Sequence, residues 1–313
     1  MTLTNIRFPE DNPFSRIKLR HIFGWLFLLS TSISFQIVMI AYTRGIKIDG
    51  KSPLDPLFGV IFGTYLCILI LALVGRQCRL AGIEIKYLVG KVPTHYQWFP
   101  LVGLAIANVV FSISVFRVFY YPLSFIVPSF VEKLLIDRNS SILITPSETF
   151  FPALYYLTSA IFYYVISPIF SAFIVAAILL HRWAAKWGKT RGIIAFFLLS
   201  LISYNFISSV IATSINAILY VKTRSLLVLI IFIALKNLIL GIWNLSYTTF
   251  LDNQAGSTLD VFRSQVQLGV LFFVVSAPWV IGFIYKNWSV LKGPLPYFAN
   301  ASEAEKIKAD SET

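Results

Sequence analysis

The sequence predicts an all-α fold, a polytopic membrane bundle of about eight transmembrane helices with both termini in the cytoplasm. Composition is the first reason, because 57% of the 313 residues are hydrophobic and 13% are charged, whereas soluble domains carry about 25% charged residues. The second reason is the recurrence of apolar stretches long enough to cross a bilayer. The third is the distribution of lysine and arginine, which orients the bundle.

Apolar stretches of roughly the 20 residues that a membrane-spanning helix requires recur along the chain. Five qualify directly, and they are 22–43, 57–75, 98–116, 225–250 and 266–285. A longer run, 151–181, contains Pro168, and we count it as one tilted or kinked helix. We expect neighbouring helices to satisfy the carbonyl that this proline leaves without a donor.

Residues 192–221 also lack charge, but Tyr204, Asn205, Ser208 and Ser209 place polar groups in their middle. They form either one long helix or a hairpin of two short helices. With the hairpin, most of the 26 lysine and arginine residues fall on the cytoplasmic side, whereas one long helix divides them almost evenly. Cytoplasmic loops are enriched in these residues, so we expect the hairpin.

The chain reads as one membrane domain, 22–285, with a cytoplasmic segment at 1–21 and a cytoplasmic tail at 286–313. From Ala299 onward the tail is polar and lacks apolar periodicity, so we expect it to be flexible. In the long outer loop, Phe125 to Asp137 mixes apolar and charged residues, which predicts an interfacial helix.

The net charge of +12 does not indicate nucleic acid, because the basic residues cluster at the ends of apolar segments rather than on one polar face. We expect membrane lipids, and another membrane protein, as partners. The predicted location is a cell (inner) membrane, with a thylakoid membrane as the alternative.

Titratable groups that could carry chemistry are scarce inside the predicted spans. No acidic residue falls between Glu148 and Asp252, and the three histidines, His21, His95 and His181, stand at cytoplasmic helix ends or loops. We expect these histidines to contact headgroups. Metal-assisted hydrolysis and acid–base catalysis need such groups at the site, so no metal and no cofactor are expected.

Lys236 is the one ionisable residue deep in a predicted span, 225–250. Burying an ammonium there is costly unless a counter-charge compensates it. It either binds an anionic headgroup or a partner's carboxylate, or it snorkels to the interface or loses its proton. Other polar side chains at membrane depth are expected to hydrogen-bond between helices, and they are Ser171, Tyr204, Asn205, Asn216, Asn237 and Asn244.

Two stretches resemble the CPBP family of CAAX-protease and bacteriocin-processing membrane proteins, over a core of about 151–250. The first is Ser167-Pro-Ile-Phe, followed by the basic, glycine-terminated segment Ile178-Leu-Leu-His-Arg-Trp-Ala-Ala-Lys-Trp-Gly188. The second is Leu219-Tyr-Val-Lys-Thr-Arg-Ser-Leu226, which is similar to the family's turn before its last motif. The resemblance implies an intramembrane protease fold.

The residues that the family uses for catalysis are nearly all replaced. Its Glu-Glu pair and the following arginine correspond to Ser171, Ala172 and Ala176, and its second-motif histidine corresponds to Tyr204, or to Asn205 with one residue of slippage. The final His-x-x-x-Asn motif corresponds to Ile233 and Asn237, so only the asparagine is kept. The fold can persist where the chemistry is lost.

The leading hypothesis is therefore a proteolytically inactive member of this fold that acts as a membrane scaffold or binding partner. Its candidate pocket is lined by Ser171, Tyr204, Asn205, Lys236 and Asn237. One alternative is an active endopeptidase with displaced catalytic residues, for which Glu148 is the candidate acid. The other is a carrier of a small apolar or lipid molecule.

Overall fold

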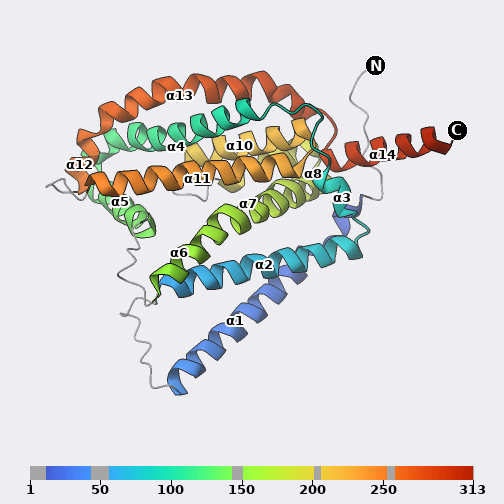
Figure 1. The fold of residues 1–313 in the computed structure, drawn as a ribbon, viewed down its shortest axis with the longest axis horizontal. Coiled ribbons are helices and arrows are strands. Elements are labelled where there is room, and N and C mark those ends of the chain that lie inside the picture. Colours follow the sequence, from blue (N-terminus) through green and yellow to red (C-terminus); the bar gives the residue numbers. More distant parts are fainter. Residues whose placement is uncertain (1–11, 44–55, 143–150, 201–205, 252–257, 313) are drawn as a thin grey trace.

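The computed structural model describes residues 12–43, 56–142, 151–200, 206–251 and 258–312. Within these ranges all regular structure is helical and no strand occurs, which confirms the predicted all-α class. Most helices are long and run side by side (Figure 1).

Six helices in the described part of the chain are long and apolar enough to cross a membrane. They are α2 (Pro56–Leu80), α4 (Trp98–Ile126), a composite helix from Pro152 to Trp187, α10 (Phe206–Thr223), α11 (Leu226–Leu251) and α13 (Val266–Asn287). All six coincide with predicted spans and indicate a multi-pass membrane protein.

The other two predicted spans correspond to α1 (Leu19–Thr43) and α9 (Lys189–Leu199). Several side chains of α1 lie outside the described set, and α9 has only 11 residues, which is short for a full crossing. The total of about eight spans, and the cytoplasmic location of both termini, therefore remain predictions.

The composite helix becomes π-helical twice along its length. It consists of α6 (Pro152–Ile161), η3 (Phe162–Ile166), α7 (Ser167–Phe170), η4 (Ser171–Leu179) and α8 (Leu180–Trp187). The segments η3 and η4 are π-helical, with hydrogen bonds five residues apart. This geometry is rare and is found mostly as single turns near functional sites, so the resemblance to a catalytic motif falls on the least regular helix of the bundle.

Helix α4 lies at the centre of one layer, between α13 and α11, with α10 packed behind it (Figure 1). The composite helix packs on the other side of α11, α2 packs on the composite helix, and α1 diverges from α2 toward one end. The main core is centred on α10 and α11, where its most deeply buried side chains are Ile215, Ile218, Val228, Leu229 and Phe232.

A second, smaller core lies at the end of the bundle where α4 finishes. There α5 (Pro128–Ile142) and α12 (Thr258–Ser264) pack against α4, burying Val131 and Leu135. A helix is thus present where the mixed pattern from Phe125 to Asp137 predicted one.

At the opposite end, which we call the basic end, the structure brings together the short elements η1 (Pro13–Arg16), α3 (Ile85–Val89) and η6 (Trp288–Lys292) and the terminal helix α14 (Pro296–Glu312). Its basic residues include Arg182, Lys222, Arg224, Lys286 and Lys292. Positions that the charge distribution assigned to one side of the membrane therefore lie at one end of the molecule.

The expectation of a flexible tail from Ala299 was wrong, because α14 continues as a helix to Glu312. Pro296 occupies its first turn, where proline is favoured, and alanine, glutamate and lysine, which favour helices, fill the rest. The tail lacked apolar periodicity because only its first turn, with Tyr297 and Ala299, packs on the bundle.

Candidate functional site

The positions that correspond to the family's catalytic acids lie where the composite helix meets α11. Segment η4 packs directly on α11. Ala172 and Ala176 are 0% and 2% exposed, Ile233 of α11 is 4% exposed, and all three belong to the main core. Ser171 is partly buried. Apolar side chains therefore fill the contact between these helices.

Asn237, the one position that matches the family pattern in the resemblance, makes an interhelical hydrogen bond. Its Nδ2 donates to the backbone carbonyl of Tyr163 in η3, at 2.8 Å. In this π-helical register the N–H of Ser167 donates to Phe162, and the next partner in the series, for Tyr163, would be residue 168. Because Pro168 has no N–H, Asn237 supplies the missing donor.

The same face of α11 approaches the composite helix closely one turn later. Gly241 lies one helical turn beyond Asn237, and a Cβ built on it would lie within contact of the Tyr164 hydroxyl. Asn237 and Gly241 together hold α11 against η3. The prediction of interhelical hydrogen bonding is confirmed for Asn237, and its partner is the carbonyl that the proline was expected to leave free.

Lys236 lies near the middle of α11, on the same face as the fully buried Leu229 and Phe232, seven and four residues earlier. The side chain is partly buried. Among the residues that the structure describes, no carboxylate or other acceptor bonds to its ammonium. A lysine amine without a partner among the described residues thus lies beside the Asn237 contact.

The remaining members of the predicted pocket are not placed. Tyr204 and Asn205 lie outside the described residues, as do Glu148 and the side chain of Asn244. Asn216, on α10, has a buried Oδ1 without a partner among the residues that the structure describes. The structure therefore brings together Ser171, Lys236 and Asn237 only to the extent that η4 and α11 are in contact.

His181 corrects the expectation of headgroup contact, because it is fully buried at the basic end. Its Nδ1 lies 2.6 Å from the Ala177 carbonyl, and its Nε2 accepts the N–H of Tyr297 at 3.3 Å. The Phe14 ring stacks on the imidazole with centroids 4.8 Å apart. This pair of hydrogen bonds uses one nitrogen as donor and the other as acceptor, as in a neutral ring.

Tyr297, at the start of α14, is 7% exposed and ties three elements of this end together. Its hydroxyl accepts the N–H of Glu84 at 3.5 Å, and its ring packs edge-on against Phe14 and Tyr87. Burial raises the pKa of the Tyr297 phenol, which keeps the group neutral. Sequence patterns did not single out this residue. An aromatic residue directly after Pro296 could have indicated a helix start that packs on the bundle.

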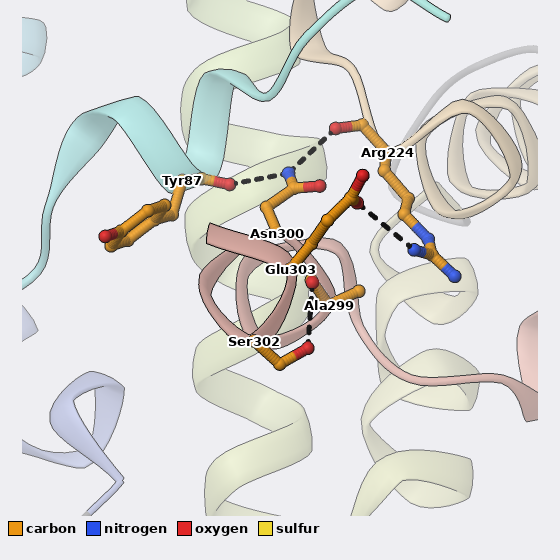
Figure 2. A network of polar contacts seen from close by, with 6 residues as sticks. All are labelled: Tyr87, Arg224, Ala299, Asn300, Ser302 and Glu303. Carbon is orange, nitrogen blue, oxygen red and sulfur yellow. Dashed lines mark hydrogen bonds and ion pairs between the residues drawn. The ribbon is translucent and has the colours of Figure 1, made fainter. Parts of the chain in front are cut away.

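The turn that resembles the family, Leu219–Leu226, is bound by side chains of α14. Arg224 adopts φ 53°, a left-handed conformation that residues other than glycine adopt uncommonly. Figure 2 shows Asn300 of α14 beneath it, donating Nδ2 to the carbonyls of Arg224 at 3.0 Å and Tyr87 at 2.8 Å. Glu303 forms a 3.9 Å ion pair with the Arg224 guanidinium.

Sequence reasoning also missed two arginines at the other end of the bundle. Arg117 of α4 is 5% exposed, and its guanidinium donates to Gln265 at 2.8 Å. Arg263 of α12 donates to the Ser124 hydroxyl at 3.2 Å and lies 4.5 Å over the Phe125 ring. These bonds lie along the ten residues by which α4 extends past its predicted end.

The described residues contain no group of three or more histidine, cysteine, aspartate or glutamate side chains arranged to hold a metal ion. Compared with models of known protein families, with curated proteins and with solved structures, the chain matches none.

Proposed function

We propose that this chain is a membrane-embedded scaffold, built on a bundle of the CPBP type, that binds another membrane protein through the partly buried Lys236 of α11. The proposal takes the scaffold as proteolytically inactive. It places the protein in an inner membrane with its basic end toward the cytoplasm.

The observation that carries the proposal is the role of Asn237. Its side-chain amide is engaged by the Tyr163 carbonyl that Pro168 leaves without a donor. Retention of this asparagine is therefore explained by packing of α11 on the composite helix, without catalysis. The alanines at the corresponding acid positions support the same conclusion, because they are buried in the core.

Lys236 supplies the argument for a partner. A charged side chain at membrane depth is tolerated when it pairs with an opposite charge or lines a polar cavity. No acidic residue of this chain falls between Glu148 and Asp252, so the spans around Lys236 contain no carboxylate of their own. A carboxylate in a transmembrane helix of the partner would neutralise the ammonium and fix the register of the two proteins.

The test is affinity purification of the tagged full-length protein from its native membrane in mild detergent. We expect a stoichiometric membrane protein that has an aspartate or glutamate within a span. Lys236→Ala should lose it, Lys236→Arg should keep it, and Lys306→Ala, which removes an exposed lysine of α14, is the matched control. Charge exchange between Lys236 and the partner's acid should restore binding.

Equal recovery of the partner with Lys236→Ala would overturn the site, and the absence of any partner would overturn the scaffold. The protease alternative has its own readout in cells lacking the protein. Proteolysis would be established instead if uncleaved substrates accumulate in these cells, and if wild type but not Glu148→Gln restores their cleavage.

A further inference from the structure

A shallow hollow of about 440 Å³ lies at the basic end of α13, apart from the α11 face discussed above. Its lining residues are Ile281, Ile284, Tyr285, Trp288, Ser289 and Lys292. They come from the last turns of α13 and from η6, so one continuous stretch of chain forms the wall.

The hollow has an apolar part and a polar part in a definite order. Ile281 and Ile284 lie within the apolar span, which extends from Val266 to Lys292. Ser289 and Lys292 lie at the end of that span. Tyrosine and tryptophan are enriched where a span meets the headgroups, and Tyr285 and Trp288 separate the two parts at that level.

The end of α13 is held in place by its neighbours. Lys222 of α10 donates its Nζ to Asn287 Oδ1 at 2.8 Å, and Asn287 Nδ2 donates to the Phe283 carbonyl at 2.7 Å. The Trp288 ring packs against Phe197 with centroids 5.9 Å apart. The wall of the hollow is thus braced before any ligand enters.

The charged residues of the segment that lines the hollow are all basic. Lys286 and Lys292 are both exposed, and no acidic residue occurs between Asp260 and Glu303. Neither lysine has an ion pair among the residues described. A ligand that matches the hollow therefore combines a negative headgroup with an apolar chain.

We propose that this hollow binds one anionic phospholipid, with the phosphate at Lys292 and Ser289 and an acyl chain along Ile281 and Ile284. Zwitterionic lipids fit the apolar part equally well but gain less from the lysine. The site therefore selects by headgroup charge, and it is independent of the scaffold proposal.

The test uses the full-length protein in mild detergent with phosphatidylglycerol or phosphatidylcholine, and native mass spectrometry counts the lipids retained. Wild type should retain phosphatidylglycerol, and Lys292→Ala should reduce this retention at least fivefold while leaving phosphatidylcholine unchanged. Lys292→Arg should restore it. Lys306→Ala is the matched control for loss of one exposed positive charge.

Tryptophan fluorescence then locates the lipid. Phosphatidylglycerol with brominated acyl chains should quench wild type more than Trp288→Phe, because the chain passes beside Trp288. Equal retention of the two lipids, equal loss in Lys292→Ala and Lys306→Ala, or displacement by inorganic phosphate alone would each overturn the assignment. The last result would show that the headgroup site needs no acyl chain.

Discussion

Asn237 shows how a single side chain can preserve a distorted helix. A carbonyl without a donor cannot turn to water in the hydrocarbon region, so a neighbouring helix must supply the bond. The amide of Asn237 does this for Tyr163. Asn237 thus compensates for the donor that Pro168 lacks in the distorted segment η3.

We expect Asn237→Ala to lower the free energy of unfolding by about 1 kcal/mol, because the Tyr163 carbonyl loses its donor. In a Pro168→Ala background the same substitution should cost less, because residue 168 then has its own N–H. A double-mutant cycle of thermal unfolding in detergent measures the difference. Strictly additive effects would mean that the two residues act separately.

Two glycines at the basic end share a positive φ but differ in how closely a neighbouring element packs on them. Gly82 and Gly90 both have positive φ, at 75° and 62°, but a Cβ on Gly82 meets open space. A Cβ on Gly90 would clash with the Arg224 carbonyl and lie 2.7 Å from Asn300 Nδ2. Only Gly90 is therefore required by a neighbouring element.

Gly82→Ala should cost about 1 kcal/mol, the conformational penalty alone. Gly90→Ala should cost clearly more and should also displace α14, because Asn300 bonds to the Arg224 and Tyr87 carbonyls. Melting temperatures in detergent compare the two, and limited proteolysis reports the release of α14. Similar melting temperatures would show that the clash is relieved by a small shift.

At the scale of elements, α8 and α9 form a tight helical pair around Gly188, which has φ 81°. They meet at Gly192, where a Cβ would lie 2.5 Å from the backbone nitrogen of Ala184. Helices approach this closely only where a small residue allows it, as at many membrane helix interfaces. Packing on α8 therefore stabilises the short helix α9.

Gly192→Ala should destabilise the protein by about 1–3 kcal/mol, because the added methyl group overpacks the contact with the Ala184 backbone. Gly103→Ala in α4 is the control, since nothing lies within 4 Å of that position. Alanine is the better helix former, so the control should be neutral or slightly stabilising. Unfolding in detergent measures both, and equal effects would contradict the close contact.

At the scale of the whole molecule, the distribution of charge and the packing of the short helices both distinguish two ends of the bundle. The basic end holds α3, η6 and α14, and the other end holds α5 and α12 (Figure 1). Positive residues favour the cytoplasmic side, so we predict that the basic end faces the cytoplasm. Ser302 of α14 and Ser129 of α5 are both exposed, one at each end.

We expect Ser302→Cys to react with a membrane-impermeant maleimide only after the cytoplasmic face is opened, and Ser129→Cys to react from the opposite face. Wild type is the control, because its Cys67 and Cys78 lie in α2 and Cys78 is buried. Reaction of both substituted positions from one face would contradict the proposed orientation.

The sequence by itself determined the class of the protein and the position of its main helices. Runs such as 225–250 and 266–285 reappear as α11 and α13, because the need for about 20 apolar residues acts locally along the chain. It also indicated that polar residues at membrane depth, Asn237 among them, would bond between helices, since lipid offers them no other partner.

Only the tertiary structure decided which partners these groups have. His181 stood at a predicted helix end, yet Phe14 and Tyr297, far away in the chain, bury it. Asn237 needed an acceptor, and the π-helical register of η3 selected Tyr163 rather than a carbonyl one residue away. Which residues become partners depends on how helices distant in sequence pack together, and the hydropathy of each segment contains no information on that packing.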